Sequence, residues 1–302
     1  MRTMTTGNWE DKIVTPERVL QKLKPGMSIF IGTGVAEPRT LVKSLMHLGS
    51  GNLQDLELIQ LVSFGDAISP QELRFQRYRL KTFFSGWVSN ESIVEGHVDL
   101  IPSRFVWIPR LIESGQIPVD ATFVQITPPD GYGNCSFGLA VDAARQAMER
   151  SRLVVGEINH HVPRTFGDTF VHVSNFDFLV ISEDLPIYFE CWPIDPVFDA
   201  VAANVAGLIE DRSCIAFSIG PLYDALSRHL KSKRHLGIHS PFFTDALMDL
   251  VRAGAVTNRY KETYRGKSLA SYAIEGGTSR NFAHLRRMMY HTPAVFEKLL
   301  DK

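Results

Sequence analysis

Hydrophobic and polar positions change along the first fifty residues in a way that predicts a helix, a strand and a second helix. Residues 16–23 carry apolar side chains at helical spacing, and the Lys-Pro-Gly segment at 24–26 ends that pattern. The apolar run 27–31 predicts a buried strand. The strand breaks at the Gly-Thr-Gly of 32–34, and a second amphipathic helix is expected from Pro38.

The same order of elements occurs again in the second half of the chain. A helix is expected at 196–209, a strand at 214–218, a break at 218–220 and a helix through 222–230. Internal similarity on this scale indicates a duplicated α/β unit. We therefore predict two related open α/β domains, with residues 1–186 as the first and 187–302 as a shorter, incomplete second.

Further strands and helices alternate between these two copies. Such alternation predicts a largely parallel sheet covered by helices on both faces, with ligands at the carboxyl ends of its strands. The additional expected strands are 56–62, 81–84, 104–108, 121–127 and 152–157, with a helix at 139–151 and one or two helical turns at 90–95.

Three breaks rich in small residues follow expected strands, and this shared position suggests a shared function. The first contains Gly32, Thr33 and Gly34, and it is not a dinucleotide fingerprint because Glu37 stands where a third glycine would be needed. No phosphate-binding P-loop motif occurs either. From the residues alone, this break is either a ligand-binding turn or only a tight turn.

The second break is the segment 130–138, whose backbone amides could bind a carboxylate or carbonyl oxygen. A surface loop that needs positive φ angles is the alternative. The third break is 218–220, and His239 follows another expected strand. The adjacent histidines at 160–161 would point to opposite sides of an extended segment, which disfavours a shared metal ion.

Composition and charge narrow the possible functions. The chain of 302 residues is 44% hydrophobic and 22% charged, with a formal net charge of -1, so it offers no long-range field for nucleic acid or an anionic membrane. We expect no membrane span and no signal peptide, hence a soluble cytoplasmic protein. Cys135, Cys191 and Cys214 are expected to be buried, free thiols in a reducing compartment.

Four separate segments then resemble one known family, the acetyl-CoA hydrolases/transferases, which includes 4-hydroxybutyrate and succinate:acetate CoA-transferases. The resemblance covers roughly residues 14–273. Its segments are FIGTGVAEP (30–38), PPDGYGNCSFG (128–138), PRTFGDTFVHVS (163–174) and LGIHSPFFTDALMDLVRAGAVTN (236–258) followed by GKSLAS (266–271).

The resemblance implies two CoA-transferase-type domains that move CoA between carboxylic acids through a glutamyl-CoA thioester, or to water. Coenzyme A would act as a substrate, together with an acyl group and small carboxylates, and no other cofactor or metal is implied. The residues that the resemblance and the strand-end breaks assign to CoA or acyl binding are Gly32, Thr33, Gly34, Glu37, Gly133, Asn134, Ser136, Gly138, Ser218, Gly220 and His239.

The family's nucleophilic glutamate lies beyond the segment that matches GKSLAS, and the resemblance fades after Gly277. We therefore leave the catalytic residue unassigned and expect the chain to be inactive alone, with Glu157 and Glu275 as the remaining candidates. The alternatives are a non-catalytic CoA-binding protein and a half-enzyme that needs a partner chain. An unfinished second sheet would leave an open edge near 236–244, which predicts a homo-oligomer or a complex with a partner.

Overall fold

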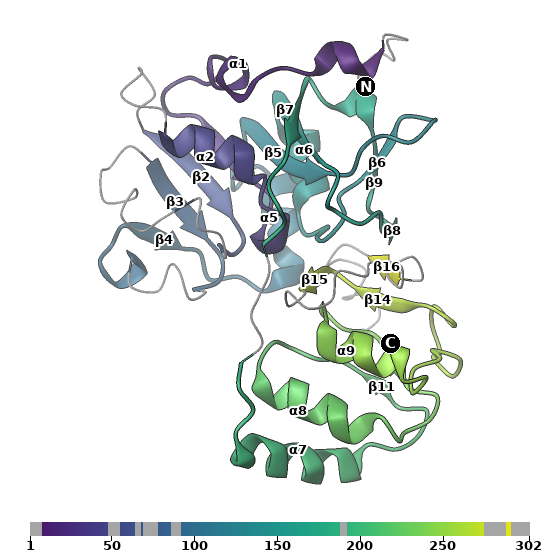
Figure 1. Cartoon of the computed structure of the whole chain (residues 1–302). Coiled ribbons are helices and arrows are strands. Elements are labelled where there is room, and N and C mark those ends of the chain that lie inside the picture. The colour runs from purple at the N-terminus through teal and green to yellow at the C-terminus, as the bar shows by residue number, and fades with distance from the viewer. Residues whose placement is uncertain are drawn as a thin grey trace. The chain divides into compact units, whose positions relative to one another are not determined.

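The computed structural model describes residues 8–47, 55–63, 68, 78–85, 92–187, 192–274 and 288–290. These residues form two compact units, each with its own sheets and helices (Figure 1). Unit 1 contains the described residues up to Arg164 together with Thr169–Ile187. Unit 2 contains Thr165–Asp168 together with the described residues from Trp192 to Tyr290.

Unit 1 is built on a seven-stranded sheet in which all neighbouring strands are parallel. The expected α/β class with a parallel sheet is therefore confirmed. In spatial order the strands are β10 (Phe178–Ser182), β7 (Leu153–Asn159), β5 (Ala121–Ile126), β1 (Ser28–Ile31), β2 (Leu56–Gln60), β3 (Tyr78–Thr82) and β4 (Val98–Leu100).

Helices cover both faces of this sheet, as the burial of every residue of β1 and β5 requires. On one face, α1 (Pro16–Leu20) and α2 (Arg39–His47) bury their apolar sides against strand residues such as Ile31 and Phe123. On the other face, Thr122 of β5 contacts Ser151 at the end of α6 (Ala144–Arg150), with 2.6 Å between the two Oγ atoms. Beside α6 lies α5 (Ile108–Glu113).

Shorter elements complete unit 1. An antiparallel pair joins β6 (Asn134–Ser136) to β9 (Phe170–His172). The 3₁₀ turns are η1 (Trp9–Lys12), η2 (Gly34–Ala36), η3 (Phe105–Trp107) and η4 (Val173–Asn175).

Unit 2 contains three helices and several short, parallel strand pairs. The helix–strand–helix order expected for 196–230 is present as α7 (Pro196–Leu208), β11 (Cys214–Ile215) and α8 (Pro221–Leu230). The other elements are β12 (Gly237–Ile238), β13 (Phe242–Thr244), α9 (Asp245–Arg252), β14 (Ser268–Ala270), β15 (Tyr272–Ile274), β16 (Met288–Tyr290) and β8 (Phe166–Gly167). The pairs are β11 with β12, β13 with β15, and β14 with β16, which also pairs with β8.

A buried lysine ties the short strands of unit 2 together. Lys261 Nζ donates to the carbonyl oxygens of Ile238 (2.7 Å) and Lys267 (2.8 Å), which links the end of β12 to the start of β14. Burial lowers the pKa of this amine to about 8. The side chain passes over Gly237, where a Cβ would lie 2.7 Å from Lys261 Cγ, so a larger residue does not fit there.

Two sequence-based expectations are wrong, one about an element and one about the burial of a cysteine. Residues 104–108 were expected to form a strand, but they form η3 and the start of α5, because Pro109 in the first turn favours a helix. The strand in this region is β4, whose three residues are too few to give a clear pattern of alternation. Cys214 is exposed, whereas Cys135 is buried as expected and Cys191 lies outside the described residues.

The expected open edge near 236–244 is paired at 236–239, while β13 has β15 on one side and its other side stays a prediction. Gly237 N donates to Ser213 O and His239 N to Ile215 O on one side, and Leu236 N donates to Ala255 O on the other. Unit 2 instead exposes apolar side chains on α7, which we call the α7 face. It consists of Val197, Phe198, Val201 and Leu208, which are 70%, 38%, 42% and 84% exposed.

Within the described part of the chain, none of the helices has the length and apolar character needed to cross a bilayer.

Candidate functional site

The strands of unit 1 end in polar side chains on the face of the sheet that α2 covers. The strand register places Gln125 beside Glu157, and Asn159 beside Ser182. On β2, Gln60 lies on the same buried face as Leu58. These polar residues continue the apolar side of each strand at its carboxyl end. We call Gln60, Gln125, Glu157, Asn159 and Ser182 the polar row; each is at most 2% exposed.

The chain leaves β1 through residues 32–38, which we call the strand-end turn. Gly32 N donates to Phe123 O (2.9 Å) and Gly34 N to Val62 O (3.1 Å), so the turn is held by the strands on both sides of β1. A Cβ on Gly32 would lie 2.6 Å from Ala36 O, and Gly34 has a φ of 55°. Both glycines are therefore required by the backbone path itself.

Buried polar contacts hold this turn against β2. The Gln60 Nε2 atom donates to Gly32 O (3.0 Å) and to Glu37 Oε2 (2.8 Å). Glu37 is only 1% exposed, so its carboxylate belongs to the interior of unit 1 and not to the surface. An anionic phosphate would be repelled at this position.

Asp142 brings the segment after β6 to the strand-end turn. Its side chain is 1% exposed, and burial raises its pKa to about 6, although the Thr33 hydroxyl and the amides of Ala144 and Ala143 favour the ionised form. Ala144 N donates to Asp142 Oδ1 at 2.8 Å. Thr33 and the segment that follows Gly138 therefore meet at one place.

Several buried polar atoms at this edge have no hydrogen-bond partner among the described residues. An unsatisfied buried polar group costs about 1–3 kcal/mol, so a set of them at one edge requires an explanation. Bound ligand or bound water is the usual one. We call these atoms the orphan set: Gln60 Oε1, Ser63 Oγ, Gln125 Nε2 and Asp142 Oδ2.

The glycine-rich segment 130–138 satisfies its own backbone. The amides of Tyr132 and Asn134 both donate to Asp130 Oδ1 at 2.9 Å, and the Gly133 amide donates to the Asp130 carbonyl. The Ser136 amide donates to the Thr127 hydroxyl, and that of Gly138 to the Ser136 hydroxyl. These amides are therefore engaged within the protein, contrary to the expectation that they offer donors to a ligand.

The remaining expected site residues lie in unit 2. The Ser240 hydroxyl accepts from Phe217 N and donates to Phe217 O, both at 2.9 Å. This contact brings His239 close to the break at Ser218 and Gly220, which precedes α8. The Gly220 φ of 133° favours glycine there. Their role in ligand binding stays a prediction.

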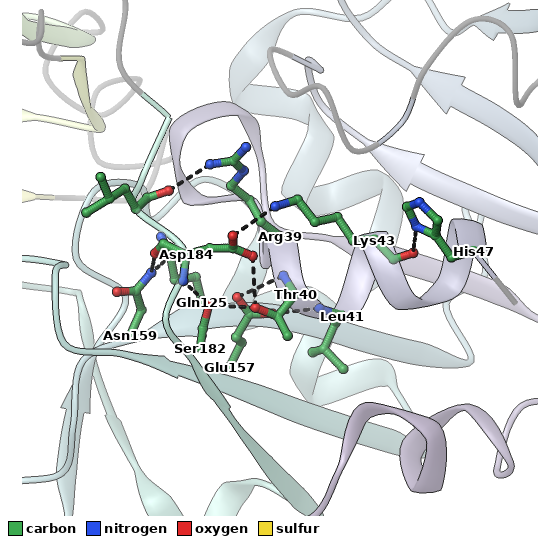
Figure 2. A network of polar contacts seen from close by, with 11 residues as sticks. Arg39, Thr40, Leu41, Lys43, His47, Gln125, Glu157, Asn159, Ser182 and Asp184 are labelled. Atoms are coloured by element: carbon green, nitrogen blue, oxygen red, sulfur yellow. Dashed lines mark hydrogen bonds and ion pairs between the residues drawn. The ribbon is translucent and has the colours of Figure 1, made fainter.

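Neither remaining candidate for a nucleophile is supported. Glu157 is fully buried, and both of its carboxylate oxygens accept backbone amides of α2 (Figure 2). Glu275 lies outside the described residues. Among the described residues there is also no group of three or more acidic, histidine or cysteine side chains that could hold a metal ion.

The comparisons with known proteins give one family for most of the chain. A sequence model of the acetyl-CoA hydrolase/transferase N-terminal domain matches residues 1–189. The 4-hydroxybutyrate coenzyme A transferase of Clostridium kluyveri is 33% identical over 266 residues, which cover 88% of this chain and 62% of that protein. This chain thus spans less than two thirds of that relative's length.

Solved structures give the same fold. RipA from Yersinia pestis has a TM-score of 0.87 and 25% identity, covering 95% of this chain and 69% of that one. A 4-hydroxybutyrate CoA-transferase from Porphyromonas gingivalis has a TM-score of 0.78 and 23% identity, covering 95% and 68% of the two chains, which shows a shared fold.

The end of the chain matches a second family that the sequence analysis missed. Residues 267–302 match a model of uroporphyrinogen decarboxylase, and 35 residues are 49% identical to that enzyme from Hordeum vulgare, covering 12% of this chain and 11% of that protein. The match begins inside the segment 266–271 that we had ascribed to the first family. Glu275 lies within it, which weakens this residue further as a CoA-transferase nucleophile.

Replacing Gly32 tests whether the strand-end turn is sterically fixed. In Gly32→Ala the new Cβ would approach the Ala36 carbonyl oxygen, a backbone atom that can move only if the turn moves, so we expect a loss of about 1–3 kcal/mol in the free energy of unfolding. Gly131→Ala is the matched control, because no atom lies within 4 Å of its added Cβ. Equal urea unfolding midpoints for the two variants would contradict the steric argument.

Proposed function

The chain belongs to the acetyl-CoA hydrolase/transferase family, and on this premise we propose that it binds a CoA thioester and a small carboxylic acid, without a further cofactor. The observation that carries the proposal is the orphan set around Thr33 at the carboxyl edge of the unit 1 sheet. Ligands of open α/β sheets bind at this edge. A ligand that supplied the missing hydrogen bonds would recover their cost.

The chemistry of the orphan set favours one part of the substrate. It contains acceptors (Gln60 Oε1 and Asp142 Oδ2), a donor (Gln125 Nε2) and a hydroxyl (Ser63). The pantetheine arm of CoA carries amides and a hydroxyl, and the thioester adds a carbonyl, so this uncharged end matches the set. The buried Glu37 and Asp142 would repel the phosphates of CoA, which we place away from this edge.

The expected site residues fit this proposal to different degrees. Gly32, Thr33, Gly34 and Glu37 form or contact the strand-end turn. In the second break, Gly133, Ser136 and Gly138 serve the backbone path, and Asn134 would contribute its side chain only. For Ser218, Gly220 and His239 of unit 2, a role in ligand binding stays a prediction.

We further propose that the 302-residue chain, assayed by itself, binds acyl-CoA without forming a glutamyl-CoA thioester. A nucleophile needs an accessible carboxylate, but the two buried glutamates of unit 1 at this edge, Glu37 and Glu157, hold the turn and α2. Binding without turnover is compatible with two roles. The chain is either a non-catalytic CoA-binding protein or a half-enzyme that a partner chain completes.

Calorimetry with three ligands tests binding and the choice of substrate end. CoA and pantetheine should both bind with Kd values of 1 mM or tighter, about 4 kcal/mol, and adenosine 3′,5′-bisphosphate should bind more weakly than CoA. In Asp142→Asn, CoA and pantetheine should both lose about tenfold in affinity. No heat from CoA at millimolar concentration would overturn the proposed function.

The same variant should gain stability, and this separates binding from folding. The Asp142 pKa is raised to about 6, so the native state loses stability as pH rises from about 4 to 6, and an asparagine avoids that loss. We expect Asp142→Asn to gain about 1–3 kcal/mol at pH 8. The control Asp130→Asn should lose stability at pH 8, since amide hydrogen bonds from Asn134 and Tyr132 lower the Asp130 pKa. Its CoA affinity should equal that of the wild type.

Borohydride trapping tests turnover. The chain is incubated with acetyl-CoA, reduced with borohydride, and examined by peptide mass spectrometry for a glutamate converted to its alcohol. We expect no reduced glutamate and no CoA release above the uncatalysed rate. A reduced glutamate at any position, together with faster CoA release, would show that this chain holds its own nucleophile.

The α7 face supports the proposal of an oligomer or partner complex, because contiguous exposed apolar side chains mark interaction sites. Sedimentation velocity should show self-association at micromolar concentration that Val201→Lys with Leu208→Lys reduces. Val94→Lys is the control, since Val94 is 84% exposed but belongs to unit 1. A monomer at all concentrations, or equal loss in the control, would contradict it.

A further inference from the structure

The first turn of α2 lacks a capping side chain of its own. The first amides of a helix have no acceptor within the helix, and the residue before it usually supplies one. Here the residue before Arg39 is Pro38, whose side chain has no acceptor atom. The acceptor comes from β7 instead: Glu157 Oε1 accepts from Thr40 N (3.3 Å) and Oε2 from Leu41 N (2.9 Å).

Side chains from three strands hold this cap in place (Figure 2). The Thr40 hydroxyl lies 2.7 Å from Ser182 Oγ and donates to Asp184 Oδ2 at 3.1 Å. Asn159 Nδ2 donates to Gln125 Oε1 (2.9 Å) and to Asp184 O (2.8 Å). The start of α2 is thereby joined to the ends of β5, β7 and β10.

These contacts fix one end of the strand-end turn, while the other end is fixed by β1. Val42 N donates to Pro38 O at 3.0 Å, so the last residue of the turn is also the first contact of the helix. We infer that Glu157 is a positioning residue: its carboxylate, by capping α2, sets the strand-end turn in the conformation that holds Thr33 beside the orphan set. The link between Glu157 and ligand binding rests on the proposed function, whereas the fixing of the turn rests on geometry alone.

The charges around Glu157 determine how its effect depends on pH. Burial raises the pKa of Glu157 to about 7, and the nearby negative charge of Asp184 acts in the same direction. Hydrogen bonds from the Leu41 amide, the Ser182 hydroxyl and the Thr40 amide act in the opposite direction and lower the pKa. Asp184 in turn pairs with Lys43 of α2 at 2.8 Å, and Arg39 donates to Leu185 O at 2.9 Å. Below pH 7 the protonated carboxyl keeps one good acceptor oxygen, and the cap weakens.

Glu157→Gln copies the protonated state at every pH, because its amide also has one acceptor oxygen. In the wild type, the native state loses stability as pH rises from about 4.5 to about 7, since the folded pKa lies above the unfolded value; the variant lacks this loss and should be at least as stable at pH 8. A residue that served folding alone would lose stability when replaced. A gain in stability with a loss of binding therefore excludes a role in folding alone.

The binding test is a pH profile of CoA affinity. At pH 8 we expect Glu157→Gln to bind CoA about 3- to 10-fold more weakly, the effect of one lost hydrogen bond. Wild-type affinity should fall as pH drops through about 7, and the variant should lack that step but keep any step near 6 from Asp142. If Glu157→Gln shows the same CoA affinity and the same pH profile as the wild type, the inference is wrong.

The control is Glu57→Gln at the opposite edge of the same sheet. Glu57 accepts from Ser28 Oγ (3.0 Å) and Lys81 Nζ (2.8 Å) near the start of β1, and it does not touch α2. This variant should keep the wild-type CoA affinity and pH profile.

A second readout needs no ligand and separates the two proposals. Amide hydrogen exchange of Thr40 and Leu41 at pH 8 should accelerate at least tenfold in Glu157→Gln and remain at the wild-type rate in Glu57→Gln. If exchange is faster in Glu157→Gln but the wild type does not bind CoA, the proposed function is wrong and the positioning of the turn still holds. Unchanged exchange would overturn the positioning role even if CoA binds.

Discussion

The contact between the Glu157 carboxylate and the first turn of α2 joins parts of the chain that are 116 and 117 residues apart. The contact from Leu41 N is buried and the one from Thr40 N is partly buried, so the protein supplies the acceptor that these amides need. Pro38 has no side-chain acceptor for these amides, so the acceptor comes from Glu157 on β7. The arrangement of the strand-end turn, the polar row and α2 depends on this contact.

The two glycine-rich segments of unit 1 have opposite roles despite similar composition. In segment 130–138, the amides of Tyr132, Asn134, Ser136 and Gly138 already donate to Asp130, Thr127 and Ser136. The strand-end turn is surrounded by buried atoms that lack partners. Unsatisfied buried polar groups are costly, so they mark the place where binding can be favourable.

Much of the fold could be predicted from the sequence because buried strands and amphipathic helices have strong periods. The fully buried, largely apolar strand β5 and the helix–strand–helix order of 196–230 are examples. Short elements were missed or mistaken: β4 has three residues, and 104–108 has a strand-like composition but is followed by Pro109 in a helical turn.

The candidate site was predicted less well, because glycine content gives no information on whether amides are already bonded. A better signal was present in the strands, where an apolar alternation ends in a polar residue, as in Phe123 to Gln125 and Val155 to Glu157. That change places polar groups at the carboxyl edge. The role of Glu157 could not be predicted, since it depends on a pairing across more than a hundred residues.

The central claim is that the orphan set binds the uncharged end of a CoA thioester. A crystal structure of the chain with bound acetyl-CoA tests it most directly. We expect an amide, hydroxyl or thioester carbonyl of the ligand to lie within hydrogen-bond distance of Gln60 Oε1, Gln125 Nε2 or Asp142 Oδ2. Acetyl-CoA bound elsewhere, with these three atoms hydrogen-bonded to ordered water, would contradict it.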